Sequence, residues 1–175
     1  RAFAEVAARV SKKKPIVVLK AGRTSAGAKA ATSHTGALAG NDKIYEDVFN
    51  QCGVIRARSL RDMLEFARGV PILPTPKGEN VVIITGAGGS GVLLSDACID
   101  NKLSLMTIPP DLDAAFRKFI PPFGAAGNPI DITGGEPPIT YVNTVKLGLE
   151  DPRIHSLILG YWHTIVTPPM VFAKN

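Results

Sequence analysis

The chain has 175 residues, of which 45% are hydrophobic and 20% charged, and its formal net charge is +5. These proportions are ordinary for a globular protein and exclude a disordered chain and a coiled coil. No apolar run approaches the roughly 20 residues that a membrane-spanning helix needs, so no membrane partner is expected.

The first part of the chain alternates amphipathic stretches with short apolar runs, which predicts βα units and a parallel sheet. A region rich in glycine and alanine, 21–40, is predicted to be a loop. Around it we expect a helix over 2–10, a strand over 15–19, a helix from the cap at Asn41 to about Cys52, a short strand at 54–55 and a helix from the cap at Ser59 to about Gly69.

Three prolines within 70–78 predict a linker, because proline stiffens a connection and blocks a helix. The alternation then restarts, and the chain is expected to stop inside this second α/β part. The predicted elements are a strand over 81–85, a helix over 92–101, a strand over 103–108, a helix over 111–119, a loop over 121–138, a helix over 139–150 and a strand over 154–161.

His34 lies in the predicted loop among small residues, in the sequence Ser-His-Thr-Gly-Ala-Leu-Ala-Gly. Neutral imidazole is a nucleophile near pH 7, and small neighbours leave room for phosphate oxygens and a large partner. The loop alone also allows a solvated surface histidine. The sequence therefore marks His34 as a candidate phosphoryl carrier that needs support from elsewhere in the chain.

The run 86–91, Gly-Ala-Gly-Gly-Ser-Gly, matches the dinucleotide fingerprint between a predicted strand and helix. NAD binding is disfavoured because the next predicted strand ends in Thr-Ile-Pro-Pro without the acidic residue that binds ribose. An anion site at the helix N-terminus and simple close packing of strand and helix both remain open.

The remaining polar residues predict little chemistry of their own. The only basic cluster, 12–14, ends a predicted helix, where it complements the helix dipole, and no aromatic residues interleave with it, so nucleic acid is not expected. Cys52 and Cys98 are expected to be buried free thiols in a reducing cytoplasm. His155 is expected at a strand edge, His163 is a weak site candidate after a strand, and no metal site is expected.

Four segments together resemble the nucleoside-diphosphate-forming acyl-CoA synthetases, which include ADP-forming acetate–CoA ligases and succinyl-CoA synthetase. They are 20–24, 33–40, 86–91 and 127–134. The resemblance implies two flavodoxin-like, Rossmann-type three-layer units with parallel sheets, both incomplete: the end of a first succinyl-CoA-ligase-like domain over 1–70, a linker over 71–78 and a truncated second domain over 79–175. A CoA-binding domain and an ATP-grasp domain or subunit would complete the enzyme, and an oligomer is expected.

By this resemblance His34 is the phosphohistidine of a reaction that converts acyl-CoA, phosphate and ADP into the free acid, CoA and ATP through an acyl phosphate. The full-length protein would use CoA, ATP or ADP, Mg²⁺ and a small carboxylic acid such as acetate, with none bound tightly to this part, which alone would be inactive. The implied phosphate-binding candidates are Gly88, Gly89, Ser90 and Gly91, and the loop and interface candidates are Ser33, Thr35, Gly36, Asn128, Asp131, His163 and Thr164.

Two other interpretations stay open. Some protein lysine acetyltransferases carry a similar region in a regulatory role, and a bare CoA- or anion-binding module has no chemistry. His34 favours the enzyme, because a regulatory copy has no need to keep a phosphorylatable residue. An Asn-Pro turn explains Asn128 and Asp131 structurally as well as an interface does.

Overall fold

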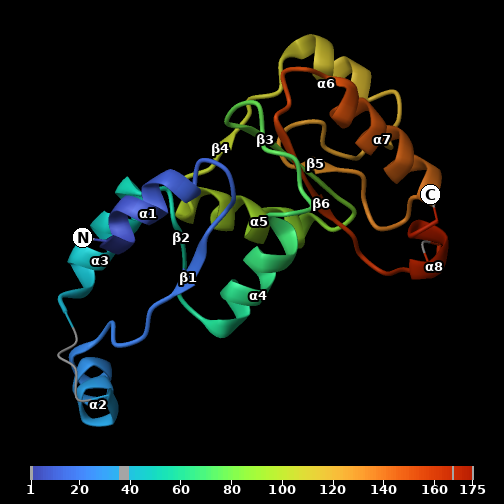
Figure 1. Ribbon diagram of the computed structural model, residues 1–175. Helices are drawn as coiled ribbons and strands as arrows, with labels where there is room; N and C mark the ends of the chain where they lie inside the picture. Colours follow the sequence, from blue (N-terminus) through green and yellow to red (C-terminus); the bar gives the residue numbers. More distant parts are fainter. Residues whose placement is uncertain (1, 36–39, 167, 175) are drawn as a thin grey trace. The chain divides into compact units, whose positions relative to one another are not determined.

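A computed structural model describes residues 2–35, 40–166 and 168–174. The chain divides into two compact units, Arg1–Thr75 and Pro76–Asn175, and each is described by itself. Both are α/β units with parallel strands, which confirms the predicted fold class (Figure 1).

The first unit has a two-stranded parallel sheet, in which Val17 pairs with Ile55 and Leu19 with Ala57. Its small core joins α1 and α3 around Phe49, and α4 packs on both strands. Its elements are α1 (Ala2–Val10), β1 (Val17–Leu19), α2 (Ser25–Thr35), α3 (Asp42–Gln51), β2 (Ile55–Ala57) and α4 (Leu60–Gly69).

Both predicted helix caps of this unit are confirmed. The side chain of Asn41 accepts a hydrogen bond from the Lys43 amide at 2.9 Å and begins α3. Ser59 accepts from the Asp62 amide at 3.0 Å, and its hydroxyl donates to the Asp62 carboxylate at 2.7 Å. Each cap satisfies a backbone N–H group that the first helical turn leaves free.

The predicted loop over 21–40 is wrong for most of its length, because α2 occupies Ser25–Thr35. Thr24 begins this helix: its hydroxyl accepts from the Gly27 amide at 3.1 Å and its carbonyl from the Ala28 amide at 2.8 Å. The helix contains four alanines and one glycine. Alanine has the highest helix propensity of any residue, and four alanines outweigh the cost of one glycine. Residues 36–39 lie outside the described part of the chain.

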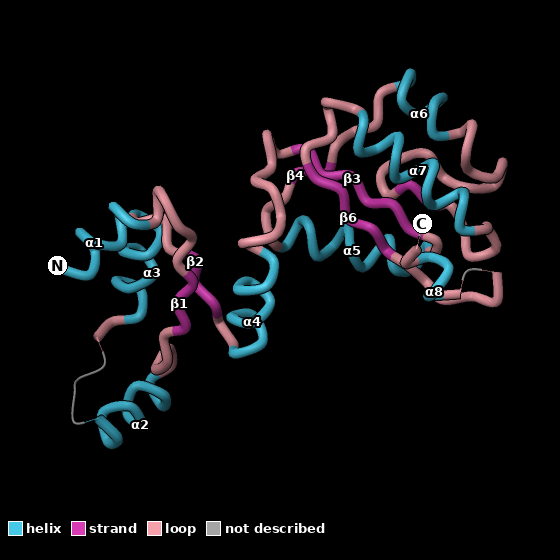
Figure 2. Tube along the Cα trace, turned by 45° about the vertical axis from the view of Figure 1, so that its right-hand side comes forward, coloured by secondary structure: helices cyan, strands magenta, loops and turns pink. Residues whose placement is uncertain are grey.

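In the second unit, β3 lies at the centre of a parallel sheet and pairs with three other strands. One edge of β3 pairs with β6 along Val81 to Thr85, whereas β4 pairs only with its beginning and β5 only with its end. The elements are β3 (Asn80–Thr85), α5 (Gly88–Asp100), β4 (Ser104–Leu105), α6 (Pro110–Phe116), β5 (Ile130–Asp131), α7 (Pro138–Glu150), β6 (Ser156–Gly160) and α8 (Pro169–Phe172) (Figures 1 and 2).

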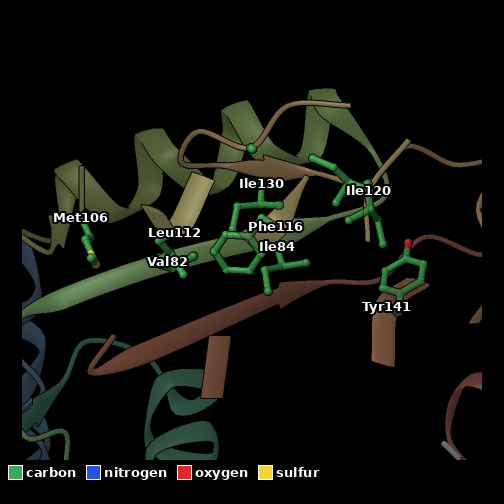
Figure 3. Close-up of a cluster of buried hydrophobic side chains, with 10 residues drawn as sticks. Val82, Ile84, Met106, Leu112, Phe116, Ile120, Ile130 and Tyr141 are labelled. Carbon is green, nitrogen blue, oxygen red and sulfur yellow. The ribbon is translucent and has the colours of Figure 1, made fainter. Parts of the chain in front are cut away.

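Alternate side chains of β3 enter two different cores, so helices cover both faces of the sheet. Val82 and Ile84 belong to one cluster with Phe116 of α6 and Tyr141 of α7. Figure 3 shows the Phe116 ring beside Ile84. On the opposite face, Val81 and Ile83 pack with Cys98 of α5. The result is the three-layer arrangement expected of a flavodoxin-like unit.

Three predictions in this unit need correction. The predicted loop over 121–138 contains β5, a strand of two residues that is too short for periodicity to reveal. The strand predicted over 103–108 is paired only at Ser104–Leu105, because Pro109 and Pro110 begin α6. Helix α5 begins at Gly88 and not at residue 92, so the last four residues of the glycine run form its first turn.

The side chain of Asn128 fills the gap between β4 and β5 along the edge of β3. Its amide oxygen accepts from the Ile83 backbone amide at 2.9 Å, and its nitrogen donates to the carbonyls of Val81 at 2.8 Å and Met106 at 3.1 Å. The primary amide thus makes the bonds that a peptide group of a neighbouring strand would make. These contacts favour a structural explanation for Asn128.

Candidate functional site

His34 lies in the last turn of α2, and its side chain is outside the described part of the structure. The hydroxyl of Ser33 donates back to the Lys29 carbonyl at 3.0 Å, a bond typical of serine in a helix. The side chain of Thr35 and all of Gly36 also lie outside the described part. The backbone therefore places the candidate phosphoryl carrier at the C-terminal end of a helix.

A cationic hollow lies at the carboxyl ends of β1 and β2, beside the start of α2. Its volume is about 330 Å³, and Lys20, Arg23 and Arg58 supply the charged part of its lining. Parallel sheets bind ligands at the carboxyl ends of their strands, and three cations favour an anion there. In the sequence, Lys20 and Arg23 belong to the segment 20–24, and nothing in their spacing predicts that they share a hollow with Arg58.

A network of charged side chains joins the beginning of α3 to both strands of the first unit. Asp42 accepts from Arg56 at 2.6 Å and from Lys20 at 3.3 Å, and Arg56 also binds the carboxylate of Glu46. The Lys20 ammonium also lies 4.5 Å from the ring centre of Tyr45. The sequence does not predict this network, because Lys20 after β1, the residues of α3 and Arg56 of β2 are far apart along the chain.

The network sets the protonation of its own members. Hydrogen bonds from Arg56, and then from Lys20, lower the pKa of Asp42, although partial burial acts against them. The bond to Asp42 raises the pKa of Arg56. Because the folded-state pKa of Asp42 is lowered, its contribution to stability is present above the pKa of an unfolded aspartate and is lost as the pH falls through the folded value.

In the second unit, the glycine run links the carboxyl end of β3 to the N-terminus of α5. The Thr85 hydroxyl accepts from the Ala87 amide at 3.1 Å and caps the turn before the helix. No side chain caps α5 at Ala87. Gly88, Gly89, Ser90 and Gly91 form its first turn, where backbone N–H groups and the helix dipole favour an anion.

An internal carboxylate already lies near this helix N-terminus. A Cβ atom placed on Gly88 would be 2.9 Å from Oδ2 of Asp131, while Oδ1 of Asp131 accepts from the Thr133 amide at 2.8 Å. The Asp131 carboxylate repels an anionic ligand beside Gly88, so such a ligand would bind more favourably on the side of Gly89.

The carboxyl ends of β3, β5 and β6 bring several predicted residues together. Gly134 lies against the Gly86 carbonyl and the Thr164 methyl group, at 3.3 and 3.7 Å from its ideal Cβ position. The Tyr141 hydroxyl group of α7 lies against Gly86. The centre of the Tyr141 ring is 6.3 Å from that of the Tyr161 ring. Burial raises the pKa of the Tyr141 hydroxyl.

The two other histidines lie at opposite ends of the sheet. His163 is exposed after β6. His155 accepts a hydrogen bond from the Asn80 amide at 3.1 Å, at the beginning of β3.

Gly86→Ala is expected to lower the free energy of unfolding of the second unit by about 2 kcal/mol. Its Cβ atom would lie 1.8 Å from the Tyr141 hydroxyl oxygen and 3.2 Å from the Thr133 carbonyl oxygen, so the buried Tyr141 side chain would have to shift. Denaturant unfolding of the two variants Gly86→Ala and Gly89→Ala measures the effect. Gly89 is the matched control, since no atom lies within 4 Å of its Cβ position and alanine favours the helix. Equal stabilities for the two variants would contradict the close contact.

Neither a metal cluster nor a membrane helix is found in the described ranges. No three His, Cys, Asp or Glu side chains there come close enough together to hold a metal ion. No helix among the same residues has both the length and the apolar character to cross a bilayer. Both cysteines are buried and free, as predicted.

Comparison with known protein families assigns both parts of the chain. Residues 81–175 match the model of the Ligase-CoA domain, and residues 1–70 match that of the succinyl-CoA ligase like flavodoxin domain. The chain belongs to the Ligase-CoA domain family. The resemblance to the nucleoside-diphosphate-forming acyl-CoA synthetases is thereby confirmed. His34 lies in the part that matches the succinyl-CoA ligase like flavodoxin domain, and the glycine run 86–91 lies in the part that matches the Ligase-CoA domain.

This Ligase-CoA chain is similar to several curated proteins over most of its own length. It is 45% identical over 174 residues to the alpha subunit of ADP-forming acetate–CoA ligase I of Pyrococcus furiosus, covering 99% of this chain and 37% of the relative. It is 36% identical over 158 residues to the ADP-forming 4-hydroxybutyrate–CoA ligase of Nitrosopumilus maritimus, covering 89% of this chain and 22% of the relative. The chain thus spans well under half of these proteins.

A solved structure has the same fold. The dinucleotide-forming acetyl-coenzyme A synthetase 1 of Ca. Korarchaeum cryptofilum, in complex with phosphate and ADP, matches 98% of this Ligase-CoA chain with a TM-score of 0.92 and 42% identity. The match covers 37% of that chain.

Proposed function

We propose that this chain is part of an ADP-forming acyl-CoA synthetase, with His34 as its phosphoryl carrier. The observation that carries the proposal is the identity of 45% across nearly the whole chain with an alpha subunit named as an ADP-forming acetate–CoA ligase. The nucleophilic imidazole of His34 and its small neighbours in the sequence agree with this role.

The proposed reaction has three steps. Phosphate attacks the acyl-CoA carbonyl carbon, the C–S bond breaks and the CoA thiolate leaves with a proton from solvent, which produces an acyl phosphate. An imidazole nitrogen of His34 then attacks phosphorus, and the P–O bond to the acyl group breaks to release the carboxylate. A β-phosphate oxygen of ADP attacks the phosphohistidine, the N–P bond breaks, and ATP and the free imidazole result.

Two features of the described residues support the handling of a phosphoryl group. The hollow lined by Lys20, Arg23 and Arg58 offers positive charge next to the segment that contains His34. The first turn of α5 offers backbone N–H groups and a positive dipole end in the second unit. Cations and helix N-termini stabilise a developing phosphate charge without adding a competing nucleophile.

The proposal extends to the rest of the enzyme. We infer domain boundaries at 1–70, 71–78 and 79–175, with a CoA-binding domain and an ATP-grasp domain or subunit as partners in a cytoplasmic oligomer. Mg²⁺ belongs with the nucleotide in the ATP-grasp part. The acyl group is that of a small carboxylic acid, for which acetate is the first choice, because acetate is named in relatives from Pyrococcus furiosus and Methanocaldococcus jannaschii.

Mapping of the phosphorylated residue tests the proposal. The intact protein is incubated with γ-labelled ATP and Mg²⁺ and digested with trypsin, and we expect acid-labile, base-stable label in peptide 30–43, whose only histidine is His34. Labelled acetyl phosphate should modify the same peptide. Absence of label from both donors would overturn the ligase mechanism and favour the regulatory domain of an acyltransferase; label in another peptide would overturn the role of His34.

A further inference from the structure

The segment that contains His34 begins and ends at two residues that form an ion pair with each other. Lys20 directly follows β1, and Asp42 is the first residue of α3. The Lys20 ammonium lies 3.3 Å from Oδ1 of Asp42 and also donates to the carbonyl of Gly22 at 3.4 Å. The two ends of segment 21–41 are therefore joined at its base.

Packing does not hold α2 in place. None of residues 25–33 is buried, and α2 makes no extensive contact with another helix or strand of the described residues. Figure 2 shows α2 set apart from α1, α3 and the two strands. Because a helix in a protein gains most of its positional definition from a buried face, the position of α2 depends on the two chain ends.

Arg56 ties this base to the sheet. Its side chain lies on β2 with only 7% of its surface exposed, compared with 16% for Lys20 and 27% for Asp42. One guanidinium nitrogen binds Asp42 at 2.6 Å and the other binds Glu46, one turn further along α3. A guanidinium that bridges two carboxylates defines both distance and orientation, which a single lysine ammonium does not.

We propose that Lys20, Asp42 and Arg56 are positioning residues for the phosphoryl carrier, because they fasten both ends of segment 21–41 to the carboxyl ends of β1 and β2. This inference rests on the proposed function, in which His34 holds the phosphoryl group. The three residues act through the backbone on either side of α2, and they thereby fix the position of His34 for the reaction.

Hydrogen exchange of the intact protein tests the anchoring directly. Asp42→Asn and Lys20→Met are each expected to speed exchange in peptides from 21–41 about 10-fold, while residues 46–57 keep their protection. Lys20→Arg should restore protection because it keeps the charge. Asp47→Asn is the matched control: it removes the same charge from the exposed side of α3, and no ion pair is found for it in the described structure. The double variant Lys20→Met with Asp42→Asn should be no faster than either single variant.

Single-turnover transfer tests the consequence for His34. Protein labelled in advance at His34 should pass its label to ADP about 10-fold more slowly in Asp42→Asn than in Asp47→Asn, because small misplacements of a reacting group reduce rates strongly. Asp42→Asn should melt at a lower temperature than Asp47→Asn, because it loses the pair with the nearly buried Arg56, so the transfer is measured well below both melting transitions.

The two measurements separate failure of the anchoring from failure of the proposed function. Unchanged exchange in 21–41, or faster exchange spread evenly over the whole first unit, would overturn the anchoring whatever the labelling shows. Faster exchange confined to 21–41 with an unchanged transfer rate would overturn the positioning role. Confined exchange in a protein that never takes label at His34 would overturn the proposed function and, with it, the role of the three residues in phosphoryl transfer.

Discussion

His34→Asn is expected to abolish net synthesis of ATP from acyl-CoA, phosphate and ADP, with a fall of at least about 10⁴-fold in turnover. Asparagine has a similar size but an amide nitrogen without a nucleophilic lone pair, so it forms no N–P bond. Overall turnover is measured by coupled detection of ATP, in the intact protein, side by side with incorporation of label from γ-labelled ATP.

The same variant contains its own control for folding. Formation of acyl phosphate from acyl-CoA and phosphate does not need the histidine nucleophile, and we expect phosphate-dependent release of CoA to persist for a single turnover in His34→Asn. Retention of this half-reaction with loss of ATP synthesis isolates the phosphoryl-transfer step. Full ATP synthesis by the variant would contradict the role of His34, and loss of both activities would indicate a defect beyond the carrier.

Asn128→Asp is expected to destabilise the second unit by about 3 kcal/mol or more at neutral pH. One carboxylate oxygen can still accept from the Ile83 amide, but the other would face the carbonyl oxygens of Val81 and Met106, where the amide nitrogen now donates. Three acceptors would then meet without a hydrogen, in a partly buried site. Exchange of the Ile83 amide, followed by mass spectrometry of β3 peptides, measures the loss locally.

The pH dependence of this variant follows from the same contacts. The two carbonyls stabilise a protonated carboxyl at position 128, so its folded-state pKa would be raised above that of the unfolded chain. Stability is then present below the unfolded pKa and is lost as the pH rises through the folded value. Asn101→Asp is the control, because Asn101 makes a single exposed bond to the Ala97 carbonyl and its change should cost under about 0.5 kcal/mol. A variant at Asn128 that is as stable as this control at pH 7 would disprove the sheet role.

Local signals in the sequence were sufficient for much of the fold. The caps at Asn41 and Ser59 and the apolar runs of β1, β3 and β6 depend on neighbouring residues, so each could be recognised without the rest of the chain. The boundary between the two compact units, after Thr75, lies among the three prolines of 70–78.

Features that depend on distant contacts could not be predicted in this way. The two residues of β5 form a strand only because they pair with the end of β3. The role of Asn128 depends on its hydrogen bonds to Val81 and Ile83, which are distant in the sequence. The network of Asp42 and Arg56 likewise requires the paired strands to be in place. For α2 the reason is local: the four alanines of Ser25–Thr35 favour a helix more strongly than its one glycine opposes it.

The pairing of β3 has a consequence for how the second unit folds as it is synthesised. The neighbour that covers its full edge, β6, lies about 75 residues further along the chain, as the contact between Asn80 and His155 also shows. Until Gly160 has emerged from the ribosome, the apolar sequence of β3 has an open edge that can pair with another nascent chain. Such long-range closure slows folding, so we expect this unit to depend more on chaperones during synthesis than the first unit, whose paired strands are about 38 residues apart.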